Sequence, residues 1–117
     1  MKNKPKLEIS SDGTKFWYLN GYLHRADGPA VEYPNKDKSW YLNGLLHRED
    51  GPAVKYASGD KYWYINGKLH RIDGPACEYK NGDKEWYLND KKVKKEDVIN
   101  YNITEREYID FIIKKLL

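Results

Sequence analysis

Three copies of the sequence His-Arg-x-Asp-Gly-Pro-Ala contain the residues whose types and spacing are most capable of chemistry. His24, His47 and His70 each precede an arginine, Arg25, Arg48 and Arg71 in turn, and an Asp follows each arginine by two residues. Acid–base or nucleophilic catalysis with such a group would need a nucleophile beside it, and no Ser or Cys recurs there. An enzyme also seldom needs three copies of one dyad, so we expect a non-enzymatic protein with no catalytic residues.

The three histidines are expected to lie too far apart to bind one metal ion. If each repeat adds two strands to a sheet, equivalent residues of successive repeats lie about 10 Å apart. Ligands of one zinc ion lie no more than about 4 Å from each other, because each is about 2.0–2.1 Å from the metal. The three histidines are therefore not expected to share an ion, and we predict no cofactor.

Two interpretations of the His-Arg pairs remain open. In the structural one, His and Asp tie loop backbone groups that would otherwise lack partners, and Arg packs on an aromatic ring of the neighbouring repeat. In the functional one, the three pairs form a row beside Trp and Tyr that offers stacking faces and bidentate donors. An anionic nucleotide or a phosphorylated partner requires such groups.

A tandem repeat must position these residues. Trp17, Trp40, Trp63 and Trp86 recur at intervals of 23 residues, and three full copies share the same residue at 14 of 23 positions. A repeat array is therefore predicted. We expect a flexible tail over 1–6, a repeat sheet over 7–92 and a helical cap over 93–117. Within the sheet lie full repeats at 17–39, 40–62 and 63–85 and a partial repeat at 86–92.

Each repeat contains two segments with strand character. Alternating, aromatic-rich runs predict strands over 15–19 and near 38–42, 61–65 and 84–88, with Trp on one face and the following Tyr on the other. Asn-Gly then indicates a chain reversal. Asp-Gly-Pro leads into a second short strand over 30–33, 53–56 and 76–79. Successive repeats would extend one antiparallel sheet, and an alternative with three strands pairs Leu-His-Arg directly with Trp-Tyr-Leu.

This unit of aromatic strand, Asn-Gly loop, second strand and x-Gly-Asp turn resembles the MORN repeat over roughly residues 7–90. It departs from that family where the MORN unit has glycines between its strand aromatics and a Gly-x-Gly in its second strand. The resemblance implies a mainly β fold, an elongated antiparallel sheet of tandem β-hairpin repeats. It also implies a scaffold or partner-binding function, as in bacterial antitoxin-like members. Uncharacterised phage and giant-virus proteins carry similar tracts.

The composition excludes several classes of partner. There are 21 basic and 18 acidic residues in 117, a net charge of +3, with the two signs interspersed. The sequence has no cluster of basic residues of the kind that would indicate binding to a nucleic acid polymer or to a membrane surface. Cys77 stands where the other copies have Val31 and Val54, so we expect a small buried hydrophobe. No apolar run follows the basic start, so we expect no signal peptide or membrane span and a cytoplasmic location, in the host if phage-encoded.

The C-terminal segment differs from the repeats. A short helix is expected around 95–99, and a capping box with Thr104 as N-cap and Glu107 three residues later predicts a second helix from Glu105 to about Leu116. Its broad apolar face is expected to cap the last repeat, because open sheet edges invite aggregation. The alternatives are a dimer contact or a partner-binding helix, and a homo-oligomer would form through this helix or through a sheet edge.

Specificity is expected where the copies differ, since the shared residues hold the repeat together. Phe16, Tyr22, Leu45 and Tyr62 are apolar at such positions and are candidates for an exposed contact patch. Two functions follow. The first is a module that binds a protein target, as a phage-type inhibitor, a counter-defence factor or an antitoxin-like protein would. The second is sequestration of a small anionic nucleotide by the His-Arg rows, which requires arginines free of internal partners.

Overall fold

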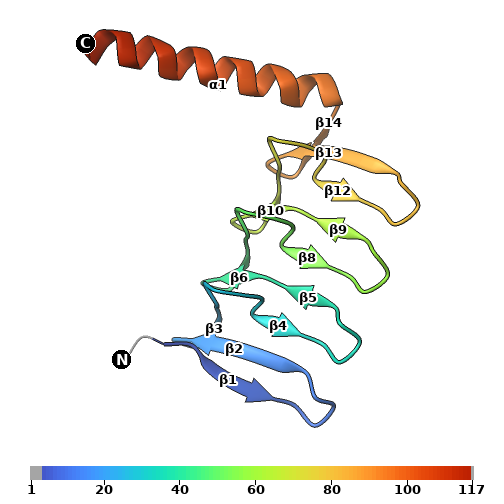
Figure 1. The fold of residues 1–117 in the computed structure, drawn as a ribbon. Coiled ribbons are helices and arrows are strands. Elements are labelled where there is room, and N and C mark those ends of the chain that lie inside the picture. Colours follow the sequence, from blue (N-terminus) through green and yellow to red (C-terminus); the bar gives the residue numbers. More distant parts are fainter. Residues whose placement is uncertain (1–3, 117) are drawn as a thin grey trace.

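A computed structural model describes residues 4–116, and it shows a stack of β-hairpins that ends in one long helix (Figure 1). The molecule is elongated, with principal extents of 55 × 41 × 18 Å and a radius of gyration of 17.2 Å. A compact domain of this length would have a radius of about 13 Å. The expected fold class, an elongated antiparallel repeat sheet with a C-terminal helical cap, is confirmed.

Fourteen strands are present in the described residues, most of them short. The first seven are β1 (Lys6–Ile9), β2 (Lys15–Leu19), β3 (Tyr22–Leu23), β4 (Val31–Glu32), β5 (Lys38–Ser39), β6 (Tyr41–Leu42) and β7 (Leu45–Leu46). The rest are β8 (Val54–Lys55), β9 (Lys61–Tyr62), β10 (Tyr64–Ile65), β11 (Lys68–Leu69), β12 (Cys77–Glu78), β13 (Lys84–Leu88) and β14 (Lys91–Val93). Strand β1 takes in Lys6, the last residue of the expected tail, and residues 1–3 of that tail lie outside the described residues.

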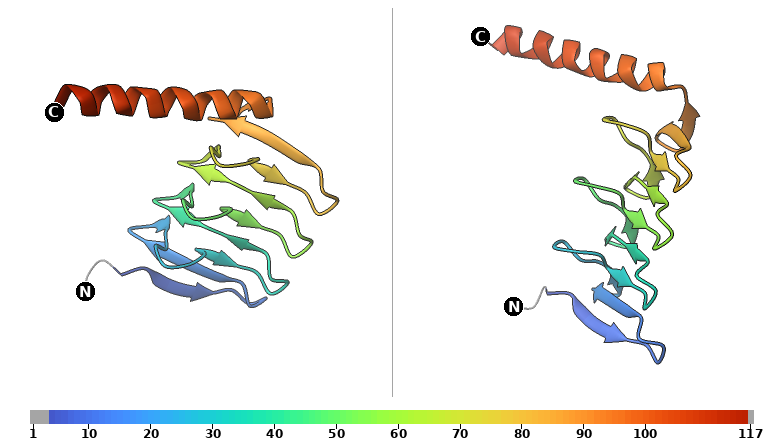
Figure 2. Two further views of the ribbon diagram at one scale, coloured as in Figure 1. Left: turned by 45° about the horizontal axis from the view of Figure 1, so that its top comes forward. Right: turned by 45° about the vertical axis from the view of Figure 1, so that its right-hand side comes forward.

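One antiparallel sheet runs the length of the stack in the order β1-β2-β4-β5-β8-β9-β12-β13-β14, with β3 paired to β2. Neighbours in this sheet are also neighbours in the layers of Figures 1 and 2. Each full repeat therefore adds two strands to the main sheet, as expected. The hairpins β6-β7 and β10-β11 stand beside it as separate two-stranded pairs.

Asn-Gly forms the tight turn of the hairpins β2-β3, β6-β7 and β10-β11. In β2-β3, Leu19 pairs with Tyr22, and the two residues between them have positive φ, 53° at Asn20 and 82° at Gly21. Two such residues make the type I′ turn whose twist matches a β-hairpin. Leu23, the leucine that precedes His24, thus pairs with Tyr18 of the aromatic strand. The three-strand alternative predicted this pairing.

The strands predicted near 38–42 and 61–65 are each interrupted at Trp. The N–H of Trp40 donates to the Ala53 carbonyl at 2.7 Å, whereas its carbonyl accepts from the N–H of His47 at 3.0 Å. The backbone therefore changes partner at Trp40, from the main sheet to the hairpin. The continuous-strand prediction was wrong at these two places because alternation of residue types does not reveal which neighbour a backbone group bonds.

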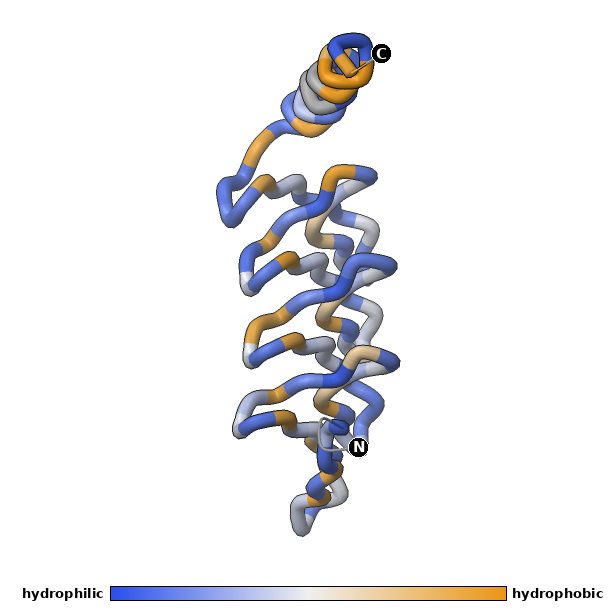
Figure 3. Tube along the Cα trace, turned by 90° about the vertical axis from the view of Figure 1, so that its left-hand side faces the viewer, coloured by the Kyte–Doolittle hydropathy of each residue, from blue (hydrophilic) through white to orange (hydrophobic). Residues whose placement is uncertain are grey.

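Strand register gives the sheet two chemically distinct faces. Phe16 pairs with Val31, Val31 with Ser39, Ser39 with Val54, and the row continues through Tyr62 and Cys77 to Glu85. Directly paired residues share a face, as do residues two apart on a strand. The tyrosines that follow members of this row by two positions in the sequence lie on the same face, which we call the tyrosine face. The tryptophans lie on the opposite face, which we call the tryptophan face. Equivalent apolar positions recur from layer to layer in Figure 3.

The fully buried residues are small. Ala30, Ala53 and Ala76 have no exposed surface, and the Val31, Val54 and Cys77 row is at most 8% exposed. The aromatic rings are mostly half-buried and cover this thin core. Cys77 is the small buried residue that was expected, and burial raises the pKa of its thiol.

A single helix, α1 (Lys95–Leu116), replaces the two predicted helices. The prediction of a helix N-terminus at Thr104 was wrong, because residue 104 lies inside α1; the side chains of Thr104, Glu105 and Tyr108 lie outside the description. The helix is instead capped at its start, where the Asp97 carboxylate accepts from the N–H of Lys94 at 2.9 Å. Acidic residues in the first turn suit the helix dipole. Nothing between 95 and 116 is Pro or Gly, so nothing stops the helix.

The first half of α1 caps the last repeat. Val98 is only 4% exposed, the Tyr101 ring meets the His70 ring edge-on at 6.2 Å, and the Asn102 amide donates to the Ile72 carbonyl. The C-terminal end of α1 extends past the repeats (Figures 1 and 2). Within the described residues, no helix combines the length and apolar character needed to cross a bilayer.

Candidate functional site

Each connector arginine is held by three groups of its own repeat. The guanidinium carbons of Arg25, Arg48 and Arg71 lie 3.9, 4.0 and 3.9 Å from the ring centroids of Trp17, Trp40 and Trp63. Each Nε donates to the Asp two residues later at 2.7–3.0 Å. Each Nη1 donates to the carbonyl of the following proline at 3.0–3.2 Å. The expectation that Arg packs on a neighbouring repeat was wrong, because the Asn-Gly hairpin folds the connector back over its own Trp.

The glycine of Asp-Gly-Pro leaves room for this arginine. A Cβ at Gly28, Gly51 or Gly74 would lie 2.7–2.9 Å from the Arg guanidinium carbon. These glycines do not have the positive φ that a turn would suggest. Space beside a stacked cation, and not backbone freedom, therefore explains why glycine recurs here.

Each connector histidine joins its repeat to the next. The Nδ1 atoms of His24, His47 and His70 accept hydrogen bonds at 2.9–3.0 Å from the backbone N–H groups of Asn43, Asn66 and Asn89. This confirms the structural role expected for histidine. The Asp of the connector differs from expectation, since it binds the arginine and not a backbone group. Within residues 4–116, no group of three or more His, Cys, Asp or Glu side chains could hold a metal ion.

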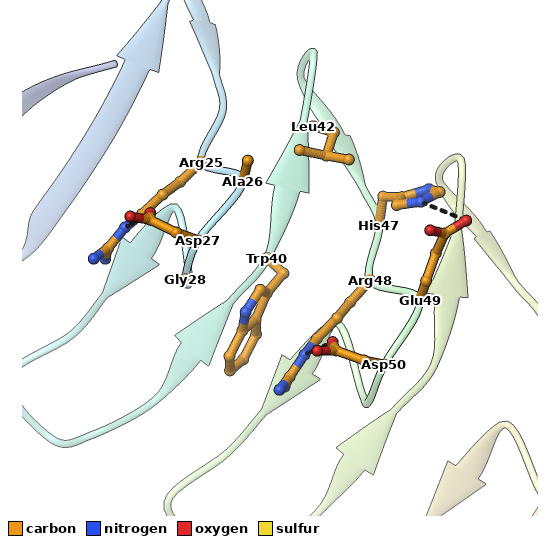
Figure 4. Close-up of a pocket in the computed structure, with 10 residues that line it drawn as sticks. All are labelled: Arg25, Ala26, Asp27, Gly28, Trp40, Leu42, His47, Arg48, Glu49 and Asp50. Atoms are coloured by element: carbon orange, nitrogen blue, oxygen red, sulfur yellow. Dashed lines mark hydrogen bonds and ion pairs between the residues drawn. The ribbon is translucent and has the colours of Figure 1, made fainter. Parts of the chain in front are cut away.

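A hollow of about 570 Å³ separates the first two connectors on the tryptophan face (Figure 4). Its walls include Arg25 and Asp27 on one side and Trp40, Arg48 and Asp50 on the other. The arginines stand here beside their own carboxylates. Each arginine already donates from Nε and Nη1 to the Asp and Pro of its own repeat, so the arginines free of internal partners that the nucleotide hypothesis requires do not line this hollow.

One row on the tryptophan face has three consecutive lysines, with Glu32 paired to one end and Glu78 to the other. Lys38 pairs directly with Lys55, and Lys55 with Lys61. Like charges directly opposite each other destabilise a sheet. The third repeat differs, because Glu78 stands where the second has Lys55 and binds Arg71 at 2.9 Å. The second repeat therefore carries a local positive charge that its neighbours lack.

The tyrosine face carries a second hollow, of about 480 Å³, and Ser39 lines it. Its wall is formed by five tyrosines and three other side chains, Tyr33, Tyr41, Tyr56, Tyr62, Tyr64, Asp37, Leu46 and Val54, together with Lys38. Phe16, Tyr62 and Glu85 occupy the position of Ser39 in the other copies. The hollow exists because the serine has no ring at a position that is otherwise filled.

The tyrosine rings form an organised surface around this hollow. Tyr62 meets Tyr56 and Tyr79 edge-on, at 5.9 Å in both cases. Tyr33 and Tyr56 are each 45% exposed. A tyrosine hydroxyl is protonated at neutral pH, and desolvation raises the pKa of Tyr41, Tyr62 and Tyr64 further above the ordinary value, so all three are donors there.

The far end of the face is closed by a charged group. The Tyr79 hydroxyl donates to the Glu85 carboxylate, which Lys92 also contacts at 2.7 Å. The lysine first, and then the tyrosine, lower the pKa of Glu85. The same hydrogen bond raises the pKa of Tyr79. At this strand the position that holds Ser39 or Tyr62 in other copies is therefore occupied by a carboxylate in a polar contact.

The residues proposed from sequence for specificity fall into two groups. Phe16 and Tyr62 belong to the tyrosine face and are half-buried. Tyr22 and Leu45 are 59% and 48% exposed at the hairpins and lean toward Gly44 and Gly67 of the next repeat. The structure does not bring these groups together as one patch.

Sequence reasoning missed the shared tyrosines and Ser39, because residues common to all copies were assigned to scaffolding and serine is not apolar. The signal was present in the alternation of Tyr along the strands. Searches against protein-family models, curated proteins and solved structures gave no match to this chain, so the geometry of the two faces is the basis for assigning a function.

Proposed function

We propose that the protein is a non-enzymatic repeat scaffold that binds a protein partner through its tyrosine face. The observation that carries this proposal is the hollow at Ser39, ringed by part-exposed tyrosines. Tyrosine is enriched in protein interfaces because its ring offers a large apolar contact while its hydroxyl still finds a hydrogen bond. Binding energy in such interfaces concentrates in a few side chains that fill pockets.

The chemistry of the hollow favours an apolar side chain as its occupant. Val54 and Leu46 supply apolar surface, and tyrosine hydroxyls and the Asp37 carboxylate supply polar groups for the backbone around an inserted residue. The engaged arginines of the tryptophan face also favour this function over nucleotide binding. In the cell, such a scaffold would act by occupying its target, as a phage-type inhibitor, a counter-defence factor or an antitoxin-like protein does; the resemblance to MORN repeats supports this class.

Sequestration of a small anionic nucleotide is the second candidate, and one observation favours it. The Lys38, Lys55 and Lys61 row lies on the same face as the tryptophan rings, so a phosphate on the lysines would lie near a stacking surface. Any such ligand would depend chiefly on lysine charge, since each arginine stacks on its own Trp and is paired with its own Asp.

Two variants that borrow residues from the other repeats separate the candidates. Ser39→Tyr fills the hollow with the residue found at Tyr62, and Lys55→Glu places on the opposite face the residue found at Glu32 and Glu78. Both are compatible with the fold because the same backbone position already holds them. We expect Ser39→Tyr to lower capture of the cognate protein, quantified by mass spectrometry, by more than about tenfold, or 1.4 kcal/mol. Lys55→Glu should leave capture unchanged.

The nucleotide candidate predicts the reverse pattern. A nucleotide at 100 times its dissociation constant should stabilise the protein by about 2.7 kcal/mol, measured as a raised thermal midpoint. Loss of that shift in Lys55→Glu but not in Ser39→Tyr, with no protein captured specifically by the wild type, would contradict the proposed function.

A further inference from the structure

The second half of α1 carries apolar side chains that the repeats do not cover. Four of them form the group we call the overhang stripe, and their exposed fractions are 53%, 37%, 49% and 81% for Ile109, Ile112, Ile113 and Leu116. A cap needs only the first turns of the helix, where Val98 and Asn102 contact the last repeat. Burying apolar side chains of this size is favourable, so the overhang stripe is a candidate contact surface.

The stripe continues the side of the helix that already packs. Ile109 follows Val98 by about three helical turns, and Leu116 follows Ile109 by about two more, so the three side chains point in one direction. The overhang stripe therefore lies on the same side of α1 as the contact with the last repeat, with Asn102 and Glu105 between the two in the sequence.

Charge decides which occupant the stripe fits. Asp110 and Lys114 lie one turn apart on one flank of the stripe, and the last turn carries Lys114 and Lys115. A helix that lies on a membrane surface would have a polar face rich in Lys and Arg, and this one mixes acids with bases. Two such helices placed antiparallel about a two-fold axis would bring the same flank of each together, acid against base.

We propose that the overhang stripe pairs with the stripe of a second copy of this chain, as an antiparallel two-fold helix pair. One register matches the whole stripe: Ile109 lies against Leu116 of the second copy and Ile112 against Ile113. In that register Asp110 lies next to Lys114 of the second copy, and symmetry makes each contact twice. The dimer would carry two outward sheets and hence two docking faces. The inference goes beyond the proposed function and does not rest on it.

The mass of the full chain in solution tests this proposal, by size exclusion with light scattering over a concentration series. We expect about twice the 13.9 kDa of one chain. Ile113→Lys should give a monomer, whereas Ile103→Lys should leave the dimer intact; both isoleucines are 49% exposed, but Ile103 lies off the stripe. A wild type that stays monomeric up to about 1 mM would overturn the proposal. So would a dimer that survives Ile113→Lys.

Charge exchange tests the antiparallel geometry. Asp110→Lys alone would bring lysine against lysine, and Lys114→Asp alone would bring Asp against Asp, so each dimer should weaken about five- to tenfold. An equimolar mixture of the two variants should form a heterodimer as tight as the wild type, because every flank contact is again between opposite charges. Circular dichroism would verify that both variants remain folded. A mixture no tighter than the single variants would overturn the two-fold pairing.

Discussion

At the scale of single residues, equivalent positions of the repeats can be compared directly, and Lys36 is the clearest case. Its φ is 80°, and the equivalent residues of the next two copies are Gly59 and Gly82, with φ of 112° and 93°. An L-residue in this region costs roughly 1–2 kcal/mol, whereas glycine adopts it freely. The first repeat therefore holds a strained turn that its neighbours avoid.

We predict that Lys36→Gly raises the free energy of unfolding by about 0.5–1 kcal/mol, since relief of strain exceeds the extra entropy of an unfolded glycine, about 0.4–1 kcal/mol. Urea denaturation would measure it. Lys36→Ala is the matched control, because alanine loses the same side chain but keeps the strain. An equal gain in both variants would show that the side chain, and not the backbone, matters.

At the scale of elements, the junction between the last repeat and α1 depends on His70. Its Nδ1 accepts from the N–H of Asn89 at 3.0 Å, its ring contacts Tyr101 of the helix, and burial lowers its pKa below the ordinary 6.5. A lowered pKa means that the folded state favours the neutral ring. The stabilisation is complete above pH 6.5 and is lost as the pH falls through 6.5 toward the lower folded value.

We therefore expect the thermal midpoint of the wild type to fall between pH 7 and pH 5 more than that of His70→Asn. The asparagine oxygen can occupy the place of Nδ1 as an acceptor, and it does not titrate. The variant should be less stable at pH 8, because it loses the ring contact with Tyr101. Parallel curves for the two proteins, from a thermal melt at each pH, would mean that His70 does not sense pH.

At the scale of the whole molecule, stability should follow the number of stacked repeats, because each repeat contacts only its neighbours. Deleting residues 40–62 joins Ser39 to Trp63 and reproduces the Ser39–Trp40 junction. His24 would then meet Asn66 in place of Asn43, and Ser39 would pair with Cys77 in place of Val54. We predict a folded protein with a lower thermal midpoint and a smaller dependence of unfolding free energy on urea.

Deleting residues 40–51 is the control for this experiment. It removes about half a repeat, so the strand that follows would no longer meet its partner, and we expect loss of the β signal in circular dichroism. If the deletion of 40–62 unfolds the protein as completely, the repeats are not the independent units that their contacts indicate.

Sequence alone determined the features that depend on local rules. The period of 23 residues, the turns at Asn20-Gly21, the buried position of Cys77 and the backbone role of the histidines all follow from residue types and spacing. Positive φ at Asn-Gly is a property of two residues, and a histidine that recurs in every copy has a role common to every copy.

Tertiary structure alone decided the features that depend on which segments become neighbours. The hairpin returns Arg48 over Trp40 of its own repeat, and strand pairing surrounds Ser39 with tyrosines from three repeats. Contacts with the last repeat support the start of one continuous helix at Lys95. The capping signals in the sequence had instead predicted that a second helix begins at Thr104. In each case the deciding interaction joins groups distant in sequence, because cross-strand register and packing set their distance in space.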